Sequence, residues 1–534
     1  MSIVAKDTSK RLLAVHGWSG VLLGLFLYVV VITGTVSVLA HEIGDWSISG
    51  TRDTAPFSQS IDARVTALAD SVDPRFREDV SIYPNAAGSL IVFFHTHGTN
   101  NAGDPDDLGV RFTLAPQTLE IVRRDQGYGM ELPGDPEDAL SQFITTLHIS
   151  LHAPNPIGLY LTGLAGFVML FAVISGIILH RHLLKDLFVA PRLSSRLLNR
   201  RDRHILAASW SLPFGFLLAF TGTFFSFAGS VGLPIVAMVS FGGDQTKMIE
   251  TLVGVPQATS NARADMASLD SILAQSIRRT GTQPEFVSIV HWGKADATAQ
   301  VTHGPTGTSI ESSNHIYDMT TGRYEGIKPD VGTRPSLGSS IFAWIAPLHF
   351  GHFAGLLSKF IWVGLGLATC YVTLSGLRLW VARRNDEPGW RWLGDAIPMI
   401  AYGVPIGLVW AATGFLLAYP AGDPVRWTAM GFLIGSGASV ASVVVLRSRV
   451  DVSRLLQFCL AVGLVALPVV RVMTGGAGWP SLIAAERIIP MMVDTLLISA
   501  GLCVFMMSRQ SQDLPQPSSH AANEPSNAAL MPAE

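Results

Sequence analysis

The stretch FITTLHISLHAPNPIGLYLTGLAGFVMLFAVISGIILHRH, from Phe143 to His182, decides the fold class. Its apolar centre, about 157–179, is long enough to cross a bilayer, which takes about 20 apolar residues in a helix. Ionisable side chains beside such a segment are costly and usually functional. Imidazoles stand at both of its ends, at His148 and His152 before the span and at His180 and His182 after it.

The composition of the whole chain agrees with a membrane protein. The 534 residues are 49% hydrophobic and only 14% charged, whereas soluble domains carry about 25% charged residues. The net charge of −3 gives no strongly basic face, so nucleic acid is not an expected partner. All three cysteines lie in apolar runs, which excludes a disulfide framework and a CxxC metal site.

Eight apolar runs are candidate spans, and two long polar segments interrupt them. The segments at about 42–146 and 231–345 are each large enough for a small folded domain. The sequence therefore predicts an α-helical polytopic membrane protein with about eight transmembrane helices and two α+β domains outside the bilayer. The expected spans are 17–40, 157–179, 205–229, 353–377, 396–419, 428–446, 455–473 and 488–507.

Every second connection between the spans is rich in Lys and Arg, which predicts the orientation. Cytoplasmic loops carry an excess of these residues, and the basic connections include the N-terminus and the loops that follow spans two, four and six. Both termini are therefore expected in the cytoplasm and both polar segments outside it. The tail 511–534, rich in Ser, Pro, Ala and Asn, is predicted to be disordered.

The histidines follow an internal repeat. His16 precedes Thr-Gly-Thr at 33–35 by 17 residues, and His204 precedes Thr-Gly-Thr at 221–223 by the same 17. His152 precedes Ser175-Gly176 by 23 residues, as His352 precedes Ser375-Gly376. The unit of helix, outer domain and helix thus occurs twice, and membrane repeats often place a functional site at their interface.

The histidines near the spans form two levels, one at each membrane face. His152 and His180 are 28 positions apart, or about 42 Å of helix at about 1.5 Å per residue, which exceeds a hydrocarbon core of about 30 Å. Imidazole is a common axial ligand of haem iron. Two haems, each held by histidines from two helices, would carry electrons across the bilayer.

The repeat predicts which histidines pair, although rivals remain. Symmetry pairs His152 with His352 at the outer haem and His16 with His204 at the inner haem. The rival ligands are His148, His349 and His180. His95 and His97 are two apart on a predicted strand, so they share one face and could bind a metal. Asp494, inside the last span, needs a partner, and Arg471 or Arg487 could serve.

Both outer segments read as a helix followed by strands. Residues 60–72 and 268–281 have helical spacing, and 79–98 and 111–124 read as hairpins, the first around Asn85–Gly88. In the second segment, 285–292, 298–304 and 315–326 supply strands, with a tight turn at Thr321–Gly322.

Two stretches of the sequence, together with the order of spans and outer domains, resemble PepSY-associated transmembrane proteins, also described as iron-regulated membrane proteins. The stretches are LHISLHAPNPIGLYLTGLAGFVMLFAVISGIILHRH and PLHFGHFAGLLSKFIWVGLGLATCYVTLSGLRLW. The resemblance covers roughly residues 10–385. HIYDMTTGRYEG is similar to the PepSY D-x-x-T-G hairpin, whereas LAPQTLEI has Ala115 and Leu119 where Asp and Gly are usual. The implied organisation is a first span at 10–41, a PepSY-like domain at 42–146, spans at 147–182 and 204–230, a second PepSY-like domain at 231–345, a span at 346–380, and a four-helix extension at 396–507.

Some members of this family are dihaem ferric-siderophore reductases of the Gram-negative inner membrane. The resemblance implies two haem b groups here, with haem iron bound through His152, His352, His16 and His204. It also implies a ferric siderophore as substrate in the periplasm, reduced so that Fe(II) is released. No GxGxxG stands in a strand–helix unit, so the electrons are expected from quinol or a separate reductase.

Two other functions fit the same sequence. PepSY-like domains can regulate proteases or act as sensors, in which case the spans are only anchors. A copper or haem transporter could use the same histidines as a relay. The helices of 396–507 contain no histidine, so no third haem is expected there.

Overall fold

The computed structural model describes residues 6–48, 57, 59–85, 87–100, 105–179, 187–188, 191–192, 196–244, 247–248, 260–305, 311–329, 337–384, 387–446 and 451–510. Within these ranges, eight helices are long and apolar enough to cross a membrane, which confirms the predicted number. They are α1 (Lys6–Ser37), α5 (Ile157–Leu179), α7 (Arg196–Phe227), α12 (Gly355–Arg383), α13 (Arg391–Ala418), α14 (Pro424–Leu446), α15 (Val452–Met473) and α17 (Ile488–Gln510).

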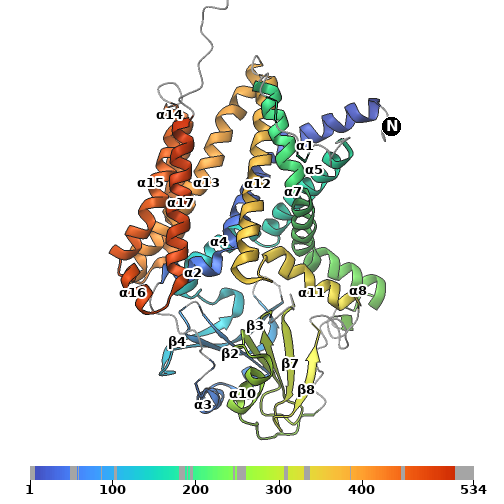
Figure 1. Cartoon of the computed structure of the whole chain (residues 1–534). Coiled ribbons are helices and arrows are strands. Elements are labelled where there is room, and N and C mark those ends of the chain that lie inside the picture. Colours follow the sequence, from blue (N-terminus) through green and yellow to red (C-terminus); the bar gives the residue numbers. More distant parts are fainter. Residues whose placement is uncertain are drawn as a thin grey trace, which may run out of the picture.

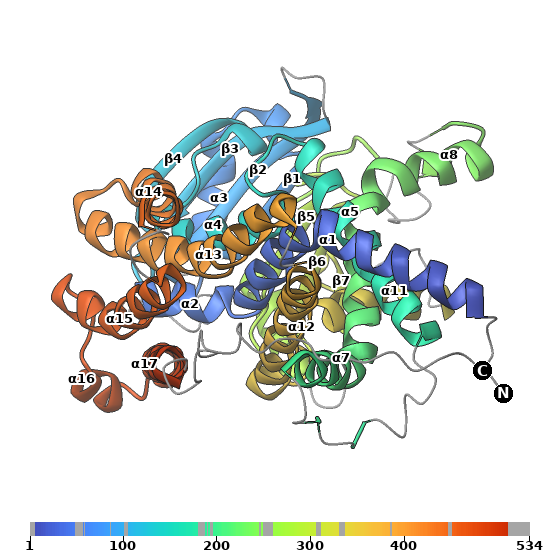
Figure 2. The same cartoon turned by 90° about the horizontal axis from the view of Figure 1, so that it is seen from above.

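The spanning helices form two groups. In the first group α1 packs against α5 and α12, and α7 closes the ring by contacting both α5 and α12. In the second, α13 packs on α14 and α15, and α15 packs on α17. Figure 2 shows the groups side by side, with α13 next to α1 and α12. We call them the histidine bundle and the C-terminal bundle.

Short helices connect the spanning helices to the remainder of the chain. They are α2 (Ala40–Ser47), α4 (Ala139–Ser150), α8 (Leu233–Phe241), α11 (Leu337–Phe350) and α16 (Trp479–Ala484). The expected spans 147–182 and 346–380 each prove to be a short helix followed by a spanning helix: α4 ends at Ser150 before α5, and α11 ends at Phe350 before α12. This break decides which histidines face the bundle.

The two outer segments fold together into one sheet. The first contributes α3 (Asp62–Ser71) and four strands, β1 (Asp79–Pro84), β2 (Leu90–Thr99), β3 (Pro105–Leu114) and β4 (Ile121–Tyr128). The second contributes α10 (Leu269–Thr280), β5 (Phe286–Val290), β6 (Thr298–His303), β7 (Ser313–Asp318) and β8 (Tyr324–Lys328). The predicted α+β character is confirmed, and the antiparallel pairing of β1 with β5 joins the halves in the order β4-β3-β2-β1-β5-β6-β7-β8.

Alternation along the strands places the core on one face of this sheet. Val80 and Ile82 of β1, and Val287 and Ile289 of β5, are fully buried with residues of α3 and α10, because side chains two apart on a strand share a face. The opposite face is contacted by the segment that leads into α4, since Arg111 bonds the Pro133 carbonyl and Arg123 bonds Asp135. In Figure 1, α3 and α10 accordingly lie at the end away from the membrane helices.

The predicted turn at Thr321–Gly322 is present between β7 and β8. Asp318 Oδ1 accepts hydrogen bonds from the amides of Thr320 and Thr321, and Gly322 adopts φ +71°. In the matching turn between β3 and β4, Leu119 takes the left-handed conformation at φ +56°. A side chain there is strained by about 1–2 kcal/mol, which is the structural consequence of the missing glycine.

Candidate functional site

Histidines of the two repeats meet at the sheet end of the histidine bundle. His148 on α4 and His349 on α11 have ring centres 6.4 Å apart and ring planes inclined by 21°. Neither helix spans the membrane; each ends one turn or less after its histidine, beside the spanning helix that follows. We call these two residues the sheet-side pair.

Hydrogen bonds fix the tautomer of both rings in the sheet-side pair. His148 Nδ1 lies 3.0 Å from the Val30 carbonyl of α1, and a carbonyl can only accept. His349 Nδ1 lies 2.8 Å from Thr221 Oγ1 of α7. That hydroxyl already donates to the Leu217 carbonyl, so it accepts from His349. Both rings therefore carry the proton on Nδ1, which leaves the lone pair of Nε2 available.

Glycines of the repeated Thr-Gly-Thr sequence make room for these rings. A Cβ on Gly34 would lie 2.6 Å from His148 Cε1, and a Cβ on Gly222 would lie 3.3 Å from His349 Cε1. The Thr-Gly-Thr repeat was visible in the sequence, but only as a marker of matched helices. Its glycines leave space for an imidazole from another helix. This role depends on how the helices pack, so it could be recognised only in the structure.

A second pair lies toward the opposite end of the same bundle. His16 on α1 donates from Nδ1 to Ser175 Oγ of α5 at 2.8 Å, because Ser175 itself donates to the Ala172 carbonyl. His204 on α7 lies 2.9 Å from Ser375 Oγ and 3.1 Å from the Val372 carbonyl of α12. We call His16 and His204 the far-side pair. Their Nδ1 atoms contact the serines of the repeated Ser-Gly sequence. In the same way, the rings of the sheet-side pair lie against the glycines of the repeated Thr-Gly-Thr sequence.

All four imidazoles thus share one arrangement. Each Nδ1–H is held by a backbone carbonyl or a hydroxyl of a neighbouring helix, and no Nε2 has a hydrogen-bond partner within the described ranges. Metal-bound histidines characteristically donate their second ring nitrogen to such an acceptor, which orients the ring and raises its basicity.

The separation of the sheet-side rings suits a metal between them. Two imidazole nitrogens at about 2 Å from one metal ion place the ring centres roughly 6 Å apart, close to the 6.4 Å observed. The far-side imidazoles are near enough to interact electrostatically. On α1 the two levels, His16 and Gly34, are 18 residues apart, or about 27 Å along the helix, as are His204 and Gly222 on α7.

The pairing of His152 with His352 is not favoured by this geometry. Leu151 and His152 both have positive φ, at 55° and 54°, and end α4. The ring of His152 is turned so that Nε2 faces the Phe143 carbonyl at 3.0 Å, which consumes the nitrogen that the other four keep available. His352 lies in the turn before α12 and stacks on Phe350. No ring contact joins His152 to His352 in the described ranges, and His180 and His182 fall outside them.

The C-terminal bundle holds a buried charge pair of another kind. Asp494 on α17 accepts from Arg471 Nη2 at 2.8 Å, from Trp46 Nε1 of α2 at 2.7 Å and from Trp479 Nε1 at 2.9 Å. Of the two partners that the sequence offered for Asp494, the structure selects Arg471. Both oxygens of this carboxylate accept hydrogen bonds, and we use the word saturated for a buried group in this condition. The site is a structural link between α2 and α17.

Comparison with known proteins agrees with the arrangement of the first four spans. The model of the family described as PepSY-associated TM region matches residues 13–383. An uncharacterized protein of Pseudomonas aeruginosa is 27% identical over 285 residues, which cover 51% of this chain and 71% of that relative. The family match ends at the last residue of α12, so the C-terminal bundle lies beyond it.

Proposed function

From the premise that this chain belongs to the PepSY-associated TM region family, we propose that it is a haem b oxidoreductase of the inner membrane. It passes electrons to a ferric siderophore in the periplasm and releases Fe(II). In this proposal both chain termini lie in the cytoplasm and the eight-stranded sheet in the periplasm. The electron donor is quinol or a separate reductase.

One observation carries the proposal: in four imidazoles, two at each end of one bundle, Nδ1–H is held by a neighbouring helix while Nε2 has no hydrogen-bond partner among the described residues. A zinc or copper relay does not require this degree of orientation in four rings on two levels. Histidines of mere anchoring helices would not require it either. The proposal assigns one haem to His148 and His349 and one to His16 and His204.

The residues around each pair have definable roles. Val30 and Thr221 orient the sheet-side rings, and Ser175 and Ser375 orient the far-side rings. Gly34 and Gly222 keep the space that those rings occupy. His148 with His349 and His16 with His204 would hold the haem, and a haem held by two imidazoles would favour electron transfer over oxygen binding. Haem b, when bound, supplies one-electron transfer.

The first experiment is a count of haem in detergent-purified protein by the pyridine haemochromogen method. We expect two haem b per chain in the parent and one in His148→Ala, His349→Ala, His16→Ala and His204→Ala. His152→Ala and His352→Ala are the matched controls and should retain two. A parent without a haem spectrum would refute the proposal and favour a sensing module or a metal transporter.

The second experiment tests the substrate. Dithionite-reduced protein, freed of excess reductant, is mixed anaerobically with a ferric hydroxamate, and the haem spectrum and Fe(II) captured by a ferrous-specific chelator are followed together. We expect reoxidation of haem with a matching yield of Fe(II). Retention of reduced haem would leave a haem protein with a different electron acceptor and would exclude the ferric hydroxamate as substrate.

A further inference from the structure

A cluster of imidazoles and carboxylates lies on the sheet, away from the histidine bundle. His95 and His97 are two residues apart on β2 and therefore share a face. Asp79 of β1 is directly opposite His95, and Asp107 of β3 is directly opposite His97. The face is the one turned away from α3 and α10, since Val80, Phe94 and Val110 on the other face belong to the core.

The potential ligand atoms converge. One oxygen of Asp79 and one nitrogen each of His95 and His97 all lie within 4.8 Å of one another. Three ligands at about 2 Å from a shared ion lie no more than about 4 Å apart, so a contraction of less than about 1 Å would complete the site. His97 Nε2 is 3.0 Å from Asp79 Oδ2, and its Nδ1 is 2.6 Å from Asp107 Oδ1.

Two buried atoms in this cluster lack hydrogen bonds. His95 is 6% exposed, and its Nδ1 has no hydrogen-bond partner among the residues that the structure describes, although Asp107 Oδ2 lies 3.5 Å away. Asp79 is 8% exposed, and within the same described ranges its Oδ1 is also without a hydrogen-bond partner. Leaving a buried polar group unsatisfied costs about 1–3 kcal/mol. An ion bound between these side chains would remove that cost.

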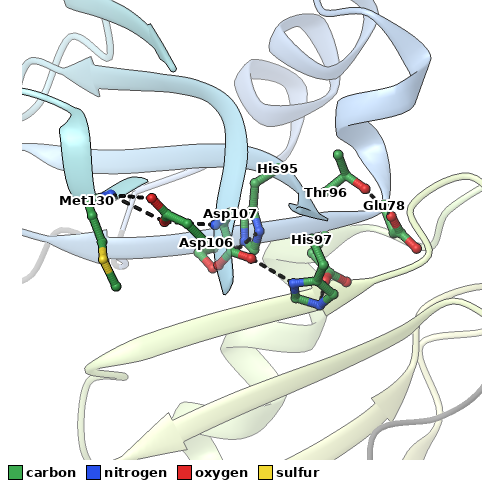
Figure 3. A network of polar contacts seen from close by, with 9 residues as sticks. Glu78, His95, Thr96, His97, Asp106, Asp107 and Met130 are labelled. Carbon is green, nitrogen blue, oxygen red and sulfur yellow. Dashed lines mark hydrogen bonds and ion pairs between the residues drawn. The ribbon is translucent and has the colours of Figure 1, made fainter. Parts of the chain in front are cut away.

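The cluster offers an ion both a route from solvent and side chains with a fixed orientation. The His97 side chain is 68% exposed, which gives an ion a route from solvent. Figure 3 shows His97 turned toward Asp107, whereas Asp106 on the same strand points away toward Met130. Opposite His95, β3 carries Gly109, where a Cβ would lie 2.8 Å from the Cβ of His95, so only glycine fits beside this imidazole.

We infer that Asp79, His95 and His97 bind a divalent first-row transition metal ion, with Asp107 as the carboxylate that positions His97. The ion takes the place of the proton that His97 shares with Asp79, and Asp107 keeps its bond to the other ring nitrogen. Two imidazoles and a carboxylate are ligands that such ions accept, with a position left for water or a further ligand. A carboxylate behind a metal-bound histidine is a common second layer.

The rival interpretation is an ion triplet without metal. Hydrogen bonds to Asp107 and then to Asp79 raise the pKa of His97 to about 10, so an imidazolium between two carboxylates would be stable by itself. That interpretation accounts for His97, and it leaves the buried Nδ1 of His95 with Asp107 Oδ2 at 3.5 Å in place of a hydrogen bond. The two interpretations differ in whether the protein binds an added ion.

The experiment is a Zn²⁺ titration by calorimetry of the full chain in detergent, with Co²⁺ absorption as a second probe of ligand geometry. We expect one saturable site per chain, with a dissociation constant raised at least 100-fold in H95Q, H97Q and D79N. D107N should raise it about 10–100-fold, as other second-layer changes do. D106N removes the neighbouring carboxylate that faces elsewhere and should change nothing.

The inference does not depend on haem, because the comparison of the parent with H95Q, H97Q and D79N at equal haem content separates binding at this cluster from Zn²⁺ bound by the imidazoles of the histidine bundle. H97Q changes an exposed side chain, so its result does not rest on correct folding of a buried variant; circular dichroism checks the others. Absence of a saturable site in the parent, or equal affinity in the parent and H97Q, would overturn the inference and leave the ion triplet as the function of the cluster.

Discussion

The histidine bundle and the C-terminal bundle both bury polar side chains, and they complete the hydrogen bonds of these groups differently. In the C-terminal bundle, Asp494 receives three donors from Arg471, Trp46 and Trp479. In the histidine bundle, each of four imidazoles has one nitrogen held and one without a partner in the described part of the chain. Burial costs both groups their hydration. Both oxygens of Asp494 regain hydrogen bonds within the protein, whereas each imidazole regains one through Nδ1 alone.

This difference separates structural polar groups from groups prepared for a ligand. A saturated pair stabilises its surroundings, because each oxygen of its carboxylate already accepts a hydrogen bond from the protein. An imidazole with Nδ1–H anchored has a fixed direction and a vacant donor atom, which is the condition for binding metal. Changes in the saturated sites should therefore affect stability and leave haem content intact, whereas changes around the imidazoles should do the reverse.

The largest effect is expected at the saturated pair. Asp494→Asn removes the charge opposite Arg471, whose side chain is 0% exposed, and turns an amide group toward donors that need an acceptor. Breaking a buried ion pair from one side costs about 3–5 kcal/mol. Thermal unfolding in detergent should show this loss, while the haemochromogen count per folded chain stays at that of the parent.

Arg426→Ala is the control for this prediction. It removes an exposed arginine from α14 of the same bundle, and the unfolding temperature should change little. If Asp494→Asn instead removed haem without destabilising the bundle, the C-terminal helices would take part in the electron path, and the separation between the two bundles would fail.

The next effect concerns a saturated histidine in the sheet. His303 is 0% exposed, with Nε2 at 2.7 Å from Ser276 and Nδ1 near Thr280 and Thr282 at 3.1 and 3.2 Å. Burial, together with the neighbouring His315, lowers the pKa of His303 to about 4. In the unfolded chain the same group titrates near 6.5.

The sign of the pH dependence follows from these values. Above about pH 6.5 the imidazole is neutral in both states, so the sheet keeps its full stability. As the pH falls toward 4, the unfolded chain gains a proton that the folded sheet does not accept, and the loss approaches about 3 kcal/mol. Hydrogen exchange of β6 and β7 in the full chain should report it. His303→Gln should flatten the profile; an equally steep profile would assign the effect to other groups.

Much of the architecture follows from local patterns, and the pairing of side chains does not. The length of the apolar runs predicted the eight spans, and the alternation of apolar and polar residues predicted the strands. Both patterns depend only on residues that are consecutive in the sequence. The β1–β5 pairing joins segments about 200 residues apart and has no local signal. For that reason the two outer segments were expected as two domains and form one sheet.

The histidine ligands illustrate the same limit. Matched spacing predicted His16 with His204 and His152 with His352, and the structure instead brings His148 to His349 at the sheet end. The reason lies in one backbone feature: α4 stops at Ser150, and the positive φ of Leu151 and His152 turns the latter away. A left-handed leucine carries no sequence signature, unlike a glycine. Asp79 and Asp107 were missed beside His95 and His97 because strand register must be known before they can be placed.

A smaller effect on haem binding is expected where a glycine leaves space for an imidazole. In Gly34→Ala the new Cβ would lie 2.6 Å from His148 Cε1 and 2.9 Å from its Nδ1, so the ring must leave its position. Crowding of this kind costs about 1–3 kcal/mol, and the haem assigned to the sheet-side pair should be lost or bound weakly. Gly20→Ala on the same helix meets no atom within 4 Å and should keep both haems. Equal haem content in the two variants would show that His148 does not hold one.

The smallest effect tests whether the anchoring bonds tune the imidazoles. Ser175→Ala removes the acceptor of His16 Nδ1–H, a hydrogen bond worth about 0.5–1.5 kcal/mol. The ring then becomes a less basic ligand and stabilises ferric iron less, so the midpoint potential of the far-side haem should rise by roughly 20–65 mV, the electrical equivalent of that energy.

Ser439→Ala is the control. Ser439 is a buried serine whose hydroxyl donates to the Gly435 carbonyl within α14 of the C-terminal bundle, so its removal should leave both potentials unchanged. A redox titration followed by absorbance measures this directly. If Ser175→Ala moved neither potential and kept both haems, the Nδ1 bond would only fix the position of His16, and the contrast between the bundles would rest on geometry alone.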